Sequence, residues 1–124
     1  MYLKNCWYVA GWSKDYGRSL IAERFLEEEI VIYRRNDGVP VALENACPHR
    51  KLPLSEGKLE GDQVICGYHG LTFNCLGQCV SAPTQPDRIP RRAVVKSYPV
   101  QDRYRLLWIW MGDPELANPD LIFP

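Results

Sequence analysis

The chain's only two histidines each stand close to a cysteine, and no other feature constrains its fold as strongly. Cys47 and His49 have the spacing C-x-H, whereas Cys66 and His69 have the spacing C-x-x-H. Residues 50–65 separate the two segments, so each segment offers one thiolate and one imidazole from a short stretch of backbone. Thiolates and imidazoles are donors that proteins use for transition metals. The spacing therefore predicts a fold that brings the two segments to one metal centre.

Two kinds of centre use this donor set. A single zinc ion takes two cysteines and two histidines in a tetrahedral structural site. A 2Fe–2S cluster with mixed ligation takes two thiolates on one iron and two neutral imidazoles on the other. Gly57, Gly67 and Gly70 favour the cluster, because glycine lets loop backbone approach closely and point N–H groups at sulfur. Pro48 and Pro53 stiffen the first segment, which lowers the entropy lost on ordering it.

Five cysteines are an odd number, which argues against a complete disulfide framework. We expect Cys6, Cys75 and Cys79 to be buried or half-buried thiols in a reducing compartment. The alternative is a disulfide between Cys75 and Cys79, across the turn that separates them, under oxidising conditions.

Composition excludes several classes of protein. The chain has 15 basic and 15 acidic side chains and no long run of like charges, so it has no electrostatic preference for nucleic acid. No stretch of about 18 apolar residues is present, so no membrane span is expected. The first residues lack a long apolar segment followed by a small-residue cleavage site, so no secretory signal is expected. The predicted location is the cytoplasm.

The pattern of apolar residues predicts an all-β chain without a convincing helix. Turns are expected at residues 36–38, 76–78 and 101–103, and a solvated loop at residues 27–29. The predicted strands are Cys6–Ala10, Leu20–Leu26, Ile30–Arg35, Val39–Leu43, Val64–Cys66, Leu71–Asn74, Val94–Val100 and Arg105–Met111.

Three further segments have distinct expectations. Trp108 and Trp110 lie two residues apart on one strand and so share a face, which predicts packing in the core. Ala82–Pro90 is too rich in proline for a central strand and is expected to be an ordered arm crossing the domain. The tail Gly112–Pro124 is expected to be a linker with little core of its own.

The ligand segments and their surroundings together resemble the Rieske 2Fe–2S domains. The resemblance is greatest to the N-terminal domain of Rieske terminal oxygenases of the vanillate O-demethylase type. It extends over nearly the whole chain, in the runs N-C-W-Y-V-A-G-W, D-G-V-P-V-A-L-E-N, C-P-H-R, C-G-Y-H-G-L-T-F and L-L-W-I-W-M-G-D-P.

The resemblance implies a Rieske fold, with an antiparallel β-sandwich base and a smaller cluster-binding subdomain of two loops. Residues 1–112 would form the Rieske domain, with the cluster-binding part at about 45–80. Residues 113–124 would be a tail or linker toward an absent catalytic domain. One Rieske-type 2Fe–2S cluster would be held by four ligands, namely Cys47, His49, Cys66 and His69.

The implied function is the transfer of single electrons from a reductase or ferredoxin to the mononuclear iron site of a Rieske aromatic oxygenase. Such an iron site needs two histidines and a carboxylate. Because the cluster uses His49 and His69, this chain is expected to hold no catalytic iron of its own. The alternative is a stand-alone Rieske ferredoxin that shuttles electrons between separate partners. Arg50 and Lys51 would either meet an acidic redox partner or form a solvated loop tip.

Two departures from the respiratory Rieske proteins bear on the reduction potential. Those proteins have an additional cysteine in each loop, where this chain has Leu52 and Tyr68. They also have hydroxyl groups near the cluster, where this chain has Leu71 and Phe73. Fewer hydrogen-bond donors to the sulfurs stabilise the reduced cluster less, so the predicted potential is low for a Rieske centre.

Overall fold

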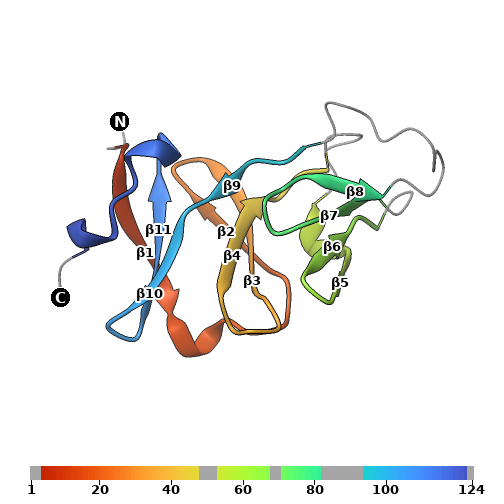
Figure 1. Cartoon of the computed structure of the whole chain (residues 1–124), viewed down its shortest axis with the longest axis horizontal. Helices are drawn as coiled ribbons and strands as arrows, with labels where there is room; N and C mark the ends of the chain where they lie inside the picture. Colours follow the sequence, from red (N-terminus) through yellow and green to blue (C-terminus); the bar gives the residue numbers. More distant parts are fainter. Residues whose placement is uncertain (1–3, 48–52, 68–70, 82–93, 123–124) are drawn as a thin grey trace.

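The structure, a computed structural model, describes residues 4–47, 53–67, 71–81 and 94–122, and it consists of three antiparallel sheets (Figure 1). Within these residues there is no α-helix, and no helix is long and apolar enough to cross a membrane. Two sheets form a base that contains the first and last strands, and the third sheet lies at the other end of the molecule (Figure 1). The predicted all-β fold, with a sandwich base and a smaller part beside it, is confirmed. The arm predicted at Ala82–Pro90 lies outside the described residues.

The first base sheet joins the two ends of the described chain. Its strands are β1 (Cys6–Trp12), β10 (Val100–Arg103) and β11 (Leu106–Met111), in the spatial order β1-β11-β10. Cys6 lies opposite Met111, so the first strand of the chain is held by the last. Leu107, Ile109 and Met111 alternate along β11 and are fully buried, because this face of the sheet packs against the second sheet.

The second base sheet separates two hydrophobic cores. Its strands are β2 (Ile21–Phe25), β3 (Glu28–Arg34), β4 (Pro40–Glu44) and β9 (Ser97–Tyr98), in that spatial order. Ile30 and Ile32 of β3 point to one core, and Val31 and Tyr33 point to the other. We call the first of these the base core: Tyr16, Ile30, Ile32, Ala42, Tyr98, Leu107, Ile109 and Met111. A strand buried on both faces explains the unbroken apolar run in β3.

The third sheet is a small meander that carries the second core. Its strands are β5 (Lys58–Glu60), β6 (Gln63–Ile65), β7 (Thr72–Phe73) and β8 (Cys79–Ser81), in that spatial order. We call the second core the site core: Val31, Tyr33, Val41, Leu43, Cys47, Leu54, Val64, Cys66, Leu71, Phe73 and Val95. Strand β5 is absent from the sequence prediction, because Leu59 is its one apolar side chain.

Two hairpin turns are built from residues that sequence rules do not associate with turns. The prediction of a loop at residues 27–29 is wrong for residues 28 and 29, which begin β3. The prediction of a turn at residues 101–103 is also wrong, because these residues belong to β10. The chain reverses instead at four left-handed residues: Leu26 (φ 50°), Glu27 (φ 67°), Tyr104 (φ 56°) and Arg105 (φ 64°). Asparagine and glycine are the usual residues in such turns, so these two turns could not be predicted from their residue types.

One predicted strand is divided by a proline. The sequence predicted a single strand over Val94–Val100, but Pro99 separates β9, in the second sheet, from β10, in the first. Proline lacks an N–H for the ladder, although the carbonyl oxygen of Pro99 still accepts from the N–H of Trp110 at 2.9 Å. The chain therefore passes from one base sheet to the other at this residue.

The C-terminal residues pack on the outer face of the first sheet. The indole N–H of Trp110 donates to the carbonyl oxygen of Asp113 at 2.8 Å, and that of Trp7 donates to Asn118 at 2.9 Å. Two short 3-10 turns follow β11, η3 (Pro114–Leu116) and η4 (Pro119–Leu121). Ile122 is 4% exposed, so the described part of the tail is held against the sheet.

The outer face also corrects the prediction for the two tryptophans of β11. Trp110 is 1% exposed and Trp108 is half-buried, so the expected burial is found for Trp110. However, both lie on the opposite side of β11 from Leu107 and Ile109, which belong to the base core. Trp110 therefore packs with Trp7 of β1 and with the tail rather than in the core between the sheets. The indole N–H of Trp108 donates to the carbonyl oxygen of Arg103 in β10 at 3.1 Å.

Candidate metal centre

Two of the four predicted ligands lie together in the site core. Cys47 follows β4 and is 1% exposed, and Cys66 follows β6 directly and is 2% exposed. The fold thus brings the two cysteines from different sheets into one apolar cluster of side chains. His49 and His69 lie outside the described residues.

The surroundings of the two cysteines fit an iron–sulfur cluster. Thiolates are soft donors that suit iron and other transition metals, and an apolar shell limits the access of water to such a centre. Leu54 is fully buried in the site core, which also contains both cysteines, and Leu71 is 7% exposed there. The donors and their environment are therefore those that a metal–sulfur centre requires.

The second ligand loop is closed by a backbone hydrogen bond. The N–H of Cys66 donates to the carbonyl oxygen of Leu71 at 2.7 Å, so the loop leaves and re-enters the meander at one point. Ile65 lies opposite Thr72 in the β6–β7 pair, which aligns the two ends of the loop. Leu71 and Phe73 belong to the site core, so the two positions expected near the cluster do share a core with Cys47 and Cys66.

Polar contacts fix the meander on the base. The hydroxyl of Tyr33 in β3 donates to the carbonyl oxygen of Asp62, in the turn between β5 and β6, at 3.1 Å. Burial raises the pKa of Tyr33 above its ordinary value, so this hydroxyl remains a donor. The carboxylate of Asp62 accepts from the N–H of Asn36 at 2.6 Å. Sequence reasoning did not single out Tyr33 or Asp62, because partners 29 positions apart form no local pattern.

All five cysteines lie in the part of the chain that the structure describes, and none of them forms a disulfide. Cys75 and Cys79 pack against the site core and are half-buried, and Cys6 is half-buried in β1. In the structure these three residues are thiols, and no disulfide joins Cys75 and Cys79.

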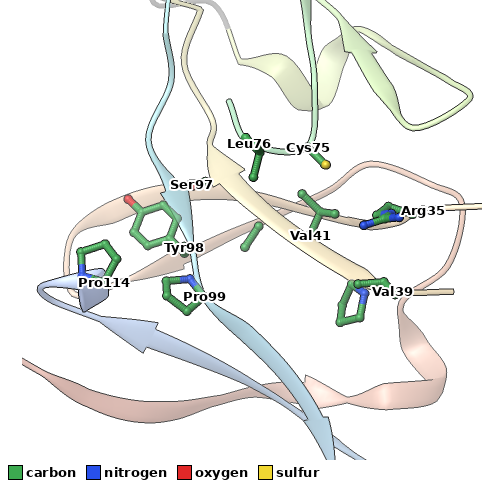
Figure 2. A pocket seen from close by; sticks show the side chains of 11 residues that line it. Arg35, Val39, Val41, Cys75, Leu76, Ser97, Tyr98, Pro99 and Pro114 are labelled. Atoms are coloured by element: carbon green, nitrogen blue, oxygen red, sulfur yellow. The ribbon is translucent and has the colours of Figure 1, made fainter. Parts of the chain in front are cut away.

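A surface hollow of about 290 Å³ lies between the base and the turn that follows β7 (Figure 2). Leu76 and Cys75 approach it from the turn, and Arg35, Val39 and Tyr98 approach it from the base. The guanidinium of Arg35 is paired with the carboxylate of Asp37 at 2.8 Å. Of the predicted ligands that the structure describes, neither lines this hollow, so it is separate from the candidate metal centre.

Comparison with known proteins defines the class. The family model of the Rieske [2Fe-2S] domain matches residues 6–99, and the chain belongs to this family. Its cofactor is accordingly a Rieske-type 2Fe–2S cluster, which removes the zinc alternative.

Two of the similar proteins are subunits of oxygenase systems. The chain is 51% identical over 121 residues to the toluene-4-sulfonate monooxygenase system iron–sulfur subunit of Comamonas testosteroni, covering 97% of this chain and 35% of the relative. It is 42% identical over 122 residues to a vanillate O-demethylase oxygenase subunit of Pseudomonas, covering 98% of this chain and 34% of the relative. The chain spans about a third of the length of these curated relatives.

The solved structures agree with this relationship. The crystal structure of apo dicamba monooxygenase superposes with a TM-score of 0.94 at 41% identity, over 99% of this chain and 38% of that one. The predicted kinship with Rieske oxygenases of the vanillate O-demethylase type is therefore confirmed.

Proposed function

We propose that this chain is the electron-transfer domain of a Rieske aromatic oxygenase resembling the O-demethylases. The observation that carries the proposal is the burial of Cys47 and Cys66 in one apolar core, at the bases of two loops that contain the chain's only histidines. In this proposal Cys47 and Cys66 bind one iron of the cluster, and His49 and His69 bind the other.

The described residues supply what such a centre needs from the protein. When bound, the cluster provides reversible one-electron chemistry. Leu54, Leu71 and Phe73 exclude water from the thiolates. The closed loop at Cys66 and the packing of β3 against the meander hold the thiolate positions nearly fixed, which keeps the reorganisation of the protein small during electron transfer.

The partners and domain organisation belong to the same proposal. The donor is a reductase or ferredoxin, and the acceptor is the mononuclear iron site of an oxygenase catalytic domain. Residues 1–112 form the Rieske domain, residues of about 45–80 bind the cluster, and residues 113–124 link it toward the catalytic domain. The support is that relatives about three times as long are oxygenase components. We also propose that the protein lies in the cytoplasm, where thiols such as those of Cys47 and Cys66 are kept reduced.

Anaerobic purification followed by iron and sulfide analysis tests the proposal. We expect two irons and two acid-labile sulfides per chain, and an EPR signal on reduction whose average g value lies below that of all-cysteine clusters. Cys47→Ser should abolish the cluster, whereas the matched control Cys79→Ser should retain it. One zinc per chain without labile sulfide would refute the ligand assignment.

A second measurement tests the direction of electron flow. The reduced protein is mixed with the catalytic part of a related oxygenase, and reoxidation of the cluster is followed by its visible absorbance. Reoxidation that depends on the added catalytic part supports the oxygenase proposal. Rapid exchange with small redox proteins but none with the catalytic part would favour a stand-alone ferredoxin.

A further inference from the structure

The first ligand loop is fastened at its base by two side chains. Asn45 follows β4, and Ser55 lies in the 3-10 turn η2 (Leu54–Glu56), so Cys47 lies between them in the sequence. The amide Nδ2 of Asn45 donates to the hydroxyl of Ser55 at 3.0 Å, and the N–H of Ser55 donates to Oδ1 of Asn45 at 2.8 Å. Asn45 is 7% exposed, so this pair of hydrogen bonds is largely shielded from water.

The two ends of the first ligand loop are also attached to the second base sheet. The backbone N–H of Asn45 donates to the carbonyl oxygen of Glu29 in β3 at 2.9 Å. Three hydrogen bonds therefore connect β3, Asn45 and Ser55 in series. The strand that lies between the two cores thus sets where the first ligand loop begins and ends.

A glycine makes the contact between the two ligand loops. A Cβ atom at Gly57 would overlap the carbonyl oxygen of Ile65 and lie 3.0 Å from its carbonyl carbon. Ile65 immediately precedes Cys66, and its position is fixed because it pairs with Lys58 and Thr72 on either side. Its carbonyl group therefore cannot move away from a new side chain without disturbing the meander.

The requirement for glycine here is a matter of space. Gly57 has φ −86°, outside the left-handed region that favours glycine, so the argument for glycine here rests on the space around it. Its N–H donates to the carbonyl oxygen of Leu54 at 2.9 Å. The sequence suggested that Gly57 allows close approach and points an N–H at sulfur; the structure shows the close approach and gives the N–H a different acceptor.

We propose that Gly57 and the Asn45–Ser55 pair are positioning residues that set the separation of the two ligand loops. This inference rests on the proposed function, because it assumes that both loops bind one cluster. A bridged diiron centre has fixed metal–sulfur geometry, so an error in the spacing of the loops acts on all ligands together. Gly57 sets the minimum distance between the loops, and Asn45 with Ser55 prevents the first loop from opening.

Cluster loading in matched variants tests the proposal. The chain and its variants are reconstituted anaerobically with iron and sulfide, and iron, labile sulfide and the EPR signal are measured. Gly57→Ala should bind the cluster about 10–100-fold more weakly, the range found when groups supporting metal ligands are removed. Gly17→Ala is the control, because a Cβ at Gly17 meets nothing within 4 Å.

The hydrogen-bonded pair gives a graded series. Ser55→Ala removes one of its hydrogen bonds and Asn45→Ala removes both, so cluster loss should be faster in Asn45→Ala. In the fraction of each variant that still binds the cluster, we expect a broadened EPR signal. A change in folding stability alone would not broaden the signal. Asn74→Ala is the matched control, because Asn74 makes similar contacts to Leu76 and Gln78 in a turn that carries no ligand.

Amide exchange in β1 and β11, which loss of the cluster alone should leave protected, separates misfolding from misplacement of the ligand loops. Retained protection in Gly57→Ala together with lost loading supports the proposal. If Gly57→Ala loses that protection, Asn45→Ala is the deciding variant. A wild-type rate of cluster loss and an unchanged EPR signal in Asn45→Ala would overturn the proposal. Full loading of Gly57→Ala would also overturn it. A wild-type chain that takes up no iron and sulfide would instead refute the proposed function itself.

Discussion

The indole ring of Trp7 meets that of Trp110 edge to face across the β1–β11 pair, with ring centroids 5.3 Å apart and planes inclined at 69°. Both indoles also donate to backbone carbonyl groups of the tail, at Asn118 and Asp113. The two rings therefore join the first strand, the last strand and the tail into one packed unit.

From these contacts we predict that removing the indole N–H of Trp110 loosens the attachment of the tail to the first sheet. Trp110→Phe removes one of the two donors to the carbonyl oxygen of Asp113, which still accepts from the N–H of Leu116 at 3.0 Å. It should lower the free energy of unfolding by about 1 kcal/mol, the net value of one hydrogen bond. Amide exchange of residues 113–122 should become faster. Trp12→Phe is the control, since Trp12 is 57% exposed. Unchanged exchange in the tail of Trp110→Phe would contradict this account.

The left-handed turn at Tyr104 and Arg105 predicts a stabilising substitution. Each residue adopts a backbone conformation that costs a side-chain-bearing residue about 1–2 kcal/mol. Tyr104→Asn combined with Arg105→Gly should therefore raise the midpoint of urea unfolding. The same change at Leu26 and Glu27 should gain less, because Leu26 packs against the base core. No gain at either turn would mean that the strain is relieved elsewhere.

Such turns show why part of the fold could not be predicted. The turn at residues 36–38 was predicted correctly, because its glycine, Gly38, adopts φ 88° and the chemistry of the residue is local. Tyr104 and Arg105 turn because β10 and β11 pair around them, which is a tertiary effect. The ligand cysteines could be predicted in the same way as the turn at residues 36–38, since their spacing is local. The Asn45–Ser55 pair could not be predicted, because it forms only when the loop between the two residues closes.

The apolar surroundings of the thiolates predict a low reduction potential. Rieske centres span about −150 to +300 mV, and a centre with few donors to its sulfurs should fall near the lower end. Leu71→Ser should raise the potential if the new hydroxyl donates to sulfur. Leu71→Ala is the matched control, because it removes similar volume without adding a hydroxyl. Equal potentials for the two variants, measured by voltammetry, would show that no such hydrogen bond forms.

The contact between Tyr98 and Glu28 predicts a loss of stability at alkaline pH. The Tyr98 hydroxyl donates to Oε1 of Glu28 at 2.7 Å, and burial, followed by the Glu28 carboxylate, raises the pKa of Tyr98 above its ordinary value. In the unfolded chain this tyrosine ionises near pH 10. Its contribution to stability is therefore complete below about pH 10 and is lost as the pH rises beyond it.

Urea unfolding at about pH 8 and about pH 11 measures this effect. The difference in unfolding free energy between the two pH values should be smaller in Tyr98→Phe than in the wild type. Tyr104→Phe is the control, because Tyr104 is 52% exposed. An identical difference in Tyr98→Phe and the wild type would assign the alkaline loss to other groups.

The division between the two cores predicts the order in which the protein loses structure when the cluster is removed. The base core contains neither ligand cysteine, whereas the site core contains both. Removing the cluster leaves Cys47 and Cys66 as the ends of loops without a common metal, and the short strands of the meander offer few other contacts. Amides of β5 to β8 should therefore exchange early in the apo protein, while those of β1 and β11 stay protected. Strand β3 should be intermediate, because Val31 and Tyr33 lose their packing while Ile30 and Ile32 keep theirs. Equal protection of all three sheets after cluster removal would show that the site core holds together without its metal.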